Sequence, residues 1–226
     1  MRISIFIFPI ILVIVFFSIK FTLPDTYKAL IQEDTWLEYL QALFYFLAAI
    51  FAFLSAILFF KNNMFIHAVL YSLLAVGLLF IAIEEISWGQ RIFNIESSDY
   101  FLEHNKQEEI TIHNLKPIQS ILHDIYIAVG FYGTFSWFVL FLVRLRKEVK
   151  PNNVLNFIVP SWFISSYYVF TMTFYFLLEY MRPELYSLSF FPRDQEPIEF
   201  ILSIGFLLFC ISNFGKLNKI LKLKIE

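Results

Sequence analysis

The sequence has little charge, few glycines and a single cysteine. Charged residues make up 16% of the 226 residues, and there are six glycines and one cysteine, Cys210. A single cysteine excludes a disulfide within the chain and also a zinc-ribbon or CxxC site. The few glycines form no repeated small-xxx-small pattern, so we do not expect tight GxxxG-type helix crossings.

The sequence also lacks the common signatures of nucleotide-dependent and hydrolytic enzymes. It contains no Walker loop and no GxGxxG, GxSxG or HExxH motif. These absences disfavour ATP-driven transport within the chain, dinucleotide redox chemistry and serine hydrolysis of the α/β type. No basic stripe of the density found in nucleic-acid-binding proteins occurs, so no nucleic-acid partner is expected.

Apolar and aromatic side chains are abundant instead. Hydrophobic residues make up 59% of the chain and aromatic residues 20%, including 30 phenylalanines, and the mean hydropathy is +0.68. This composition is typical of a membrane protein, whose partners include membrane lipids. Six stretches are long enough to cross about 30 Å of hydrocarbon as helices, near residues 3–22, 36–60, 65–88, 122–143, 154–178 and 198–214. We predict an all-α polytopic transmembrane helix bundle of about six spans, forming one integral membrane domain over residues 1–226.

Two local features complete the predicted organisation. An outer loop over residues 92–121 is long enough to carry structure, and Ser98 with Asp99 predicts a short loop helix over Tyr100 to Gln107. The first span follows directly after Met1 and Arg2 and has no A-x-A-like cleavage site, which predicts an uncleaved anchor.

The distribution of basic residues predicts the orientation of the chain. If the N-terminus is cytoplasmic, ten of the seventeen basic residues fall in short cytoplasmic segments: Arg2, Lys61, Arg144, Arg146, Lys147, Lys150, Lys216, Lys219, Lys222 and Lys224. This bias follows the positive-inside rule and places both termini in the cytoplasm. Of the nineteen acidic residues, only Glu148 and Glu226 would then lie inside. The outer face is therefore predicted to be acidic.

Five carboxylates lie within or at the ends of the predicted spans. An ionisable side chain at mid-bilayer costs on the order of 2.5–3.5 kcal/mol and is usually turned toward protein or water. With alternating helix directions, these five fall near the same outer leaflet: Glu38, Glu84, Glu85, Glu179 and Glu199. Such a group from four helices is a candidate site for general acid–base chemistry or for metal binding.

The richest stretch runs from Glu84 to Arg91. On a continuous helix, Glu84, Ser87, Trp88 and Arg91 would share one stripe, with Glu85 on the neighbouring face. We therefore predict Glu84 and Glu85 as catalytic carboxylates. The side chains of Trp88, Gln90 and Arg91 are predicted to bind substrate. The alternative is a salt-bridged helix end with an interfacial tryptophan.

A second polar stretch, in the outer loop, aligns Glu109 with His113. The two residues lie one turn apart on a helix and on the same face of an extended segment. His113 is a predicted catalytic or metal-binding residue and Asn114 a predicted substrate contact; the alternative for His113 is a polar loop contact. Carboxylate and imidazole ligands suit a divalent ion such as Zn, Fe or Mn. The hypothetical ligand set is Glu38, Glu84, Glu85, Glu109, His113 and Glu199.

The motif from Glu84 to Arg91 carries a resemblance. Together with His113-Asn114 and with the helix starts at Glu38 and Glu199, it resembles a family of uncharacterised bacterial multipass membrane proteins, over about residues 33–205. The resemblance implies a bacterial origin, and hence the inner membrane, but it implies no particular reaction.

Three functions remain open from the sequence. The first is an enzyme that performs metal-assisted or acid–base chemistry on a lipid-phase or interfacial substrate at the outer face. The second is a proton- or cation-coupled transporter or channel subunit. The third is an accessory or assembly subunit of a membrane complex. A homo-oligomer or other membrane subunits are possible partners in each case.

Overall fold

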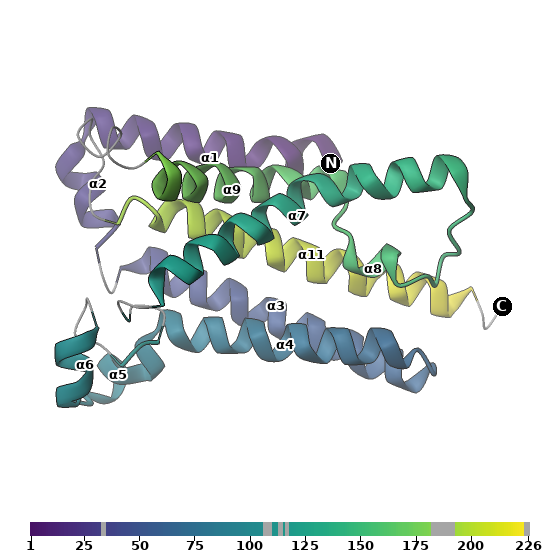
Figure 1. The fold of residues 1–226 in the computed structure, drawn as a ribbon, viewed down its shortest axis with the longest axis horizontal. Coiled ribbons are helices and arrows are strands. Elements are labelled where there is room, and N and C mark those ends of the chain that lie inside the picture. Colours follow the sequence, from purple (N-terminus) through teal and green to yellow (C-terminus); the bar gives the residue numbers. More distant parts are fainter. Residues whose placement is uncertain (33–34, 106–109, 113–114, 116–117, 182–192, 224–226) are drawn as a thin grey trace.

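The chain folds into a bundle of long, roughly antiparallel helices (Figure 1). The computed structural model describes residues 1–32, 35–105, 110–112, 115, 118–181 and 193–223. Six helical segments are long and apolar enough to cross a membrane. They contain α1 (Arg2–Thr22), α3 (Trp36–Lys61), α4 (Phe65–Glu85), α7 (Gln119–Arg146), α9 (Ser165–Tyr180) and α11 (Glu196–Lys222). The predicted all-α multipass architecture is confirmed, and the described residues contain no strand beyond an isolated bridge between Asn105 and Leu115.

Helix α11 lies at the centre of the bundle. It packs against the α3–α4 hairpin on one side and against α9 on the other, and α9 in turn packs against α7 and α1. A row of alanines on α3, including Ala48, Ala52 and Ala56, is buried against Tyr71 of α4 and Cys210 of α11. Small side chains on α3 let these three helices approach closely, because no bulky group separates their axes.

Helices α7 and α9 cross closely at two glycines of α7. A Cβ atom added at Gly130 would lie 2.6 Å from the backbone nitrogen of Met172, and one added at Gly133 would lie 2.2 Å from the Tyr168 ring. Both distances are too short for any side chain. The sequence predicted no GxxxG-type crossing from a repeated small-xxx-small pattern; here a different spacing, two glycines three residues apart, permits a close crossing.

Helix α4 ends three residues earlier than the predicted span over 65–88. Ser87, Trp88 and Gly89 all have positive φ angles, of 47°, 56° and 74°, so the right-handed helix cannot continue through them. A short turn, η1 (Ser87–Gly89), leads into α5 (Gln90–Phe93). The continuous helix assumed for the predicted stripe from Glu84 through Trp88 to Arg91 is therefore wrong, although the Trp88 indole still contacts Glu84.

The fifth span is also interrupted, although the sequence predicted a continuous segment over 154–178. It consists of α8 (Leu155–Ile158), a break at Pro160, η2 (Trp162–Ile164) and α9. Donors from other helices compensate for the break: the Tyr71 hydroxyl and the Asn213 amide donate to the Phe157 carbonyl, at 2.8 and 2.9 Å. Irregular backbone in a membrane protein needs such internal partners.

The two ends of the bundle differ in character. One end, here called the carboxylate end, contains the C-termini of α1, α4 and α9 and the N-termini of α3, α7 and α11. The helices α2 (Pro24–Leu30) and α6 (Asp99–His104) lie at this end, while the C-terminal part of the chain lies at the opposite end (Figure 1). Helix α6 confirms the predicted loop helix, with bounds shifted toward the N-terminus; the predicted residues 106 and 107 lie outside the described residues.

Candidate functional site

Polar residues at the carboxylate end form two clusters. Each cluster contains one of the last two residues of α4, Glu84 or Glu85. The Glu84 cluster consists of Glu84, Trp88, Gln90 and the loop backbone at 110–112. The Glu85 cluster consists of Glu85 with residues of α3, α9 and α11: Glu38, Gln41, Tyr45, Tyr175, Glu196 and Glu199, together with Arg193 just before α11. Adjacent residues on a helix point about 100° apart, which sends Glu84 toward the loop and Glu85 toward the bundle.

The Glu84 cluster fastens the outer loop to the end of α4. Glu84 is buried, and its Oε1 accepts a hydrogen bond from Trp88 Nε1 at 2.5 Å while its Oε2 accepts one from the Ile112 amide at 2.8 Å. Gln90 acts in the same way: its Oε1 accepts from the Ile110 amide and its Nε2 donates to Ser97 Oγ, both at 2.7 Å. These residues position the loop, because their polar atoms are engaged by the protein itself.

The Glu85 cluster places carboxylates against one another inside the bundle. Glu85 interacts electrostatically with Glu38 of α3 and with Glu196 and Glu199 of α11. It has no ion pair among the residues that the structure describes. The amide of Gln41 lies beside the Glu85 carboxyl group. Gln41 is completely buried, yet neither of its amide atoms makes a hydrogen bond of regular geometry.

Arg193 holds two of these carboxylates together. It donates to Glu38 and, at 2.9 Å, to Glu196. Both side chains are largely buried, so the bonds are poorly screened by solvent. The backbone of Arg193 has a φ of 74°, an uncommon conformation for a residue with a side chain. This contact ties the start of α11 to the start of α3.

Tyrosines surround the Glu85 cluster on its inner side. The Tyr175 hydroxyl donates to Glu199. The Tyr126 ring stacks on the Tyr175 ring with centroids 4.3 Å apart. The Tyr45 phenol is buried, interacts electrostatically with Glu85 and Glu199, and packs against the Phe206 ring at 6.0 Å. Aromatic and carboxylate groups therefore meet in one place, where α3, α7, α9 and α11 converge.

Two nearby contacts of acidic residues are structural. His123 Nδ1 lies 2.7 Å from Glu179 Oε2, and the Tyr180 hydroxyl donates to Asp124 at 3.1 Å. Both contacts join α7 to α9. Glu179, one of the five carboxylates predicted to lie near the outer leaflet, is thus paired with an imidazole between two helices.

A buried ion pair joins α1 to the segment before α11. Lys20 Nζ lies 2.6 Å from Asp194 Oδ2, and the Tyr27 hydroxyl donates to Asp194 Oδ1 at 2.9 Å. The Lys20 ammonium also lies 5.8 Å from the centre of the Tyr27 ring. Burial, together with the neighbouring Asp194 carboxylate, raises the pKa of the Tyr27 phenol. An ammonium, a carboxylate and a phenol thus form one compensated group.

An apolar cleft of about 450 Å³ lies among the helices of the bundle. Its lining comes from α4, α7, the broken fifth span and α11: Leu70, Tyr71, Leu74, Ala128, Val129, Tyr132, Gly133, Phe157, Ile158, Pro160, Tyr168, Phe206 and Phe209. Phe206 is the residue on which Tyr45 packs, and Val129 is one helical turn from Tyr126. The cleft is thus linked to the carboxylates through Tyr45 and Tyr126.

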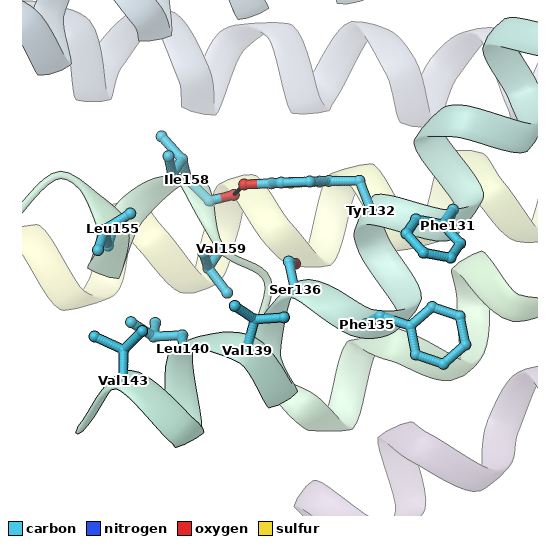
Figure 2. A pocket seen from close by; sticks show the side chains of 10 residues that line it. All are labelled: Phe131, Tyr132, Phe135, Ser136, Val139, Leu140, Val143, Leu155, Ile158 and Val159. Atoms are coloured by element: carbon cyan, nitrogen blue, oxygen red, sulfur yellow. Dashed lines mark hydrogen bonds between the residues drawn. The ribbon is translucent and has the colours of Figure 1, made fainter. Parts of the chain in front are cut away.

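A second apolar cavity, of about 390 Å³, lies farther along α7. Figure 2 shows Tyr132 between its aromatic and aliphatic lining residues, with its hydroxyl donating to the Ile158 carbonyl at 3.1 Å. Tyr132 and Ile158 line both cavities, so this hydrogen bond lies between them. No carboxylate lines the second cavity, and we assign it no chemistry.

The structure divides the residues that the sequence predicted as one site. Glu38 and Glu199 interact electrostatically with Glu85, whereas Glu84, Trp88 and Gln90 take part in the loop contacts. Glu109, His113 and Asn114 lie outside the described residues, as does the side chain of Arg91. Within the described part of the chain, no three histidine, cysteine or acidic side chains converge as metal ligands. The divalent-metal site stays a prediction, since two of its proposed ligands lie outside that part.

Sequence reasoning missed several members of the Glu85 cluster. Gln41 and Tyr45 follow Glu38 at intervals of three and seven residues, which places all three on one face of α3. That spacing was a usable signal. Arg193 offered none, because it lies in an irregular segment whose path to Glu38 no periodicity predicts.

Comparison with protein-family models, with curated proteins and with solved structures gives no match for this chain. The resemblance to a bacterial membrane-protein family therefore stays a prediction.

Proposed function

We propose that the chain is an integral membrane enzyme that performs acid–base chemistry on a lipid-phase substrate at the Glu85 cluster. The observation that carries this proposal is the environment of Glu85, which interacts electrostatically with three other carboxylates, lies beside one neutral amide and is linked to an apolar cleft through the Tyr45 ring packed on Phe206. Two carboxyl groups close together in apolar surroundings cannot both ionise easily, so one holds a proton while its neighbour accepts one. That division supplies a general acid and a general base.

Roles follow from the contacts. Glu85 is the proton donor or acceptor, because no cation is paired with it within the described chain. Glu199 is the second carboxyl group and is oriented by the Tyr175 hydroxyl. Arg193 is a positioning residue, because it fixes Glu38 and Glu196. A metal-assisted variant of this mechanism would add Glu109 and His113.

The cleft supports a substrate that arrives from the bilayer. Its lining is aromatic and aliphatic, and its volume lies in the range of ligand-binding pockets. Transport across the membrane has less support. Toward the opposite end, α11 continues from Glu199 through Ser203, whose hydroxyl donates to its own helix, to the apolar Phe206 and Phe209. This sequence of side chains favours entry from the side over passage along the bundle.

The same proposal includes a location. Basic residues at the end opposite the carboxylate end support a bacterial inner-membrane protein with both termini in the cytoplasm and the Glu85 cluster near the outer leaflet. Single-cysteine variants test this, since Cys210 is buried and contributes little background. Lys28→Cys should react with an impermeant maleimide in intact cells, and Lys150→Cys should react only after lysis. The reverse pattern would contradict the orientation.

The proposed chemistry is tested by isotope incorporation. Purified protein in nanodiscs would be incubated with a bacterial lipid extract in water labelled with deuterium and oxygen-18, and the lipids analysed by mass spectrometry. We expect one lipid class to gain label or to be consumed with the wild-type protein and not with Glu85→Gln, since proton transfer or hydrolysis draws on solvent.

Two bulky substitutions serve as controls. Ala128→Phe fills the cleft and should abolish the change, whereas Val76→Phe, at a position on α4 that is 68% exposed and does not line the cleft, should preserve it. Identical lipid profiles for wild type and Glu85→Gln would contradict the proposal.

A further inference from the structure

We propose that the Glu85 cluster binds the ammonium group of a lipid-phase amine whose apolar chain occupies the cleft between α4 and α7. This inference rests on the proposed function, since it names the class of substrate that the same site accepts. Four observations support it: the sign of the local charge, the state of Gln41, the surrounding phenol rings and the way this chain binds an ammonium group of its own.

The negative charge of the Glu85 cluster determines which kind of lipid headgroup it can bind. Glu85 faces Glu38, Glu196 and Glu199, and Arg193 bridges Glu38 and Glu196. A phosphate or carboxylate headgroup beside Glu85 would be repelled by the neighbouring carboxylates. A cationic headgroup would be attracted and would compensate Glu85. The cluster therefore favours a cation over an anion.

Gln41 provides an independent reason to expect a ligand. A buried amide with no hydrogen-bond partner is costly, and native proteins rarely leave one without cause. Gln41 is fully buried, and both amide atoms lack a regular partner beside Glu85. Its Oε1 is an acceptor for an N–H group, and its Nε2 is a donor for a carboxylate. An ammonium group satisfies the amide oxygen and the Glu85 carboxylate together.

The aromatic surroundings favour an organic cation over a metal ion. Tyr45 and Tyr126 both interact electrostatically with Glu85 and Glu199, and Tyr45 packs on the cleft-lining Phe206. Ammonium groups are attracted to the faces of such rings. A hard metal ion instead requires about six to eight oxygen ligands. Among the described residues, no three acidic or imidazole side chains are arranged as ligands of one metal ion.

The chain already compensates one ammonium group with the same partners. Lys20 Nζ lies 2.6 Å from Asp194 Oδ2 and 5.8 Å from the centre of the Tyr27 ring. The Glu85 cluster offers a carboxylate and phenol rings of the same kind but, within the described residues, no lysine. A lipid amine would complete the same combination of groups.

Thermal unfolding in phosphatidylcholine nanodiscs tests the inference. The full chain would be compared in discs containing equal mole fractions of dodecylamine, dodecanol, dodecanoic acid or dodecyl phosphate. We expect dodecylamine alone to raise the Tm of the wild-type protein. Its affinity should fall at least about ten-fold in Glu85→Gln, as expected for loss of a hydrogen bond to a charged group. Gln41→Leu should also weaken dodecylamine binding, and it serves as the test variant if Glu85→Gln folds poorly.

Controls separate this inference from the function on which it rests. Val76→Phe should retain the dodecylamine effect and Ala128→Phe should lose it, because only Ala128 lines the cleft. If dodecanoic acid or dodecyl phosphate stabilises the protein and Ala128→Phe removes that effect, the inference of an amine ligand is overturned, but the proposed lipid-phase site is supported. If sodium, magnesium or calcium salts alone give the Glu85-dependent increase, the site binds an inorganic ion and the inference is overturned. If no amphiphile depends on Ala128, both proposals fail.

Discussion

Glu84 and Glu85 are neighbours in sequence, yet their surroundings are opposite. Both oxygens of Glu84 accept hydrogen bonds, from the Trp88 indole and from the Ile112 amide. Glu85 faces three carboxylates, and beside it lies a neutral amide that has no regular bond. A carboxylate whose oxygens accept hydrogen bonds from the protein stabilises the fold. A carboxylate that lies among like charges instead favours binding of a proton or a cation. The comparison thus separates an acid that positions the loop from the acid on which the proposed function rests.

The largest loss of stability is expected where an acidic residue in a buried ion pair loses its cationic partner. Lys20→Met removes the ammonium group from the buried pair with Asp194, and breaking a buried pair in this way costs about 3–5 kcal/mol of unfolding free energy. Denaturation by SDS in mixed micelles measures the loss. Lys28→Met is the matched control: its pair with Asp25 is exposed at 3.9 Å, so the change should be within about 0.5 kcal/mol. Equal effects would show that burial does not decide the value of these pairs.

A smaller loss is expected for Glu84→Gln. The amide keeps one acceptor but turns an N–H group toward either Trp88 or Ile112, which leaves a donor without a partner and costs about 1–3 kcal/mol. The same denaturation assay measures it. Amide hydrogen exchange at Ile112 should also become faster, because its acceptor is weakened. Unchanged exchange would mean that Glu84 does not hold the loop.

A further loss of stability is expected from a substitution in the turn between the Glu84 cluster and the Glu85 cluster. Gly89 has a φ of 74°, and a Cβ atom there would lie 3.0 Å from the Phe93 ring. Gly89→Ala should therefore cost about 1–2 kcal/mol, the usual penalty for a side chain in a left-handed conformation. Gly77→Ala, in the middle of α4 with open space around it, should instead stabilise the protein by about 0.5–1 kcal/mol. A neutral Gly89→Ala variant would contradict the described turn.

The smallest effect on stability is expected for Glu85→Gln. The substitution removes a carboxyl group that faces Glu38, Glu196 and Glu199 and leaves a neutral group beside Gln41. Removing one of several mutually repelling carboxyl groups relieves that repulsion, so we expect a change of about 0.5 kcal/mol or less, or a gain. A loss as large as that of Glu84→Gln would mean that Glu85 has a structural partner, and the contrast would disappear.

Hydropathy predicted the six spans because each is a long apolar run, and alternating directions placed the acids at one end. The division between Glu84 and Glu85 was not predictable, since it depends on positive φ angles at Ser87 and Trp88 that neither residue type favours. The contact of Arg193 with Glu38 joins residues far apart in sequence through an irregular segment. Gln41 could have been noticed, because its spacing from Glu38 places both on one face of α3.

Reaction with dicyclohexylcarbodiimide tests the central claim most directly. This apolar reagent reaches carboxyl groups from the bilayer and reacts with their protonated form, leaving a stable N-acylurea that mass spectrometry locates in a peptide. We predict modification of Glu85 and none of Glu84, with the yield at Glu85 reduced by Ala128→Phe and unchanged by Val76→Phe. Modification of Glu84 as readily as Glu85, or labelling of Glu85 that is insensitive to Ala128→Phe, would contradict the account.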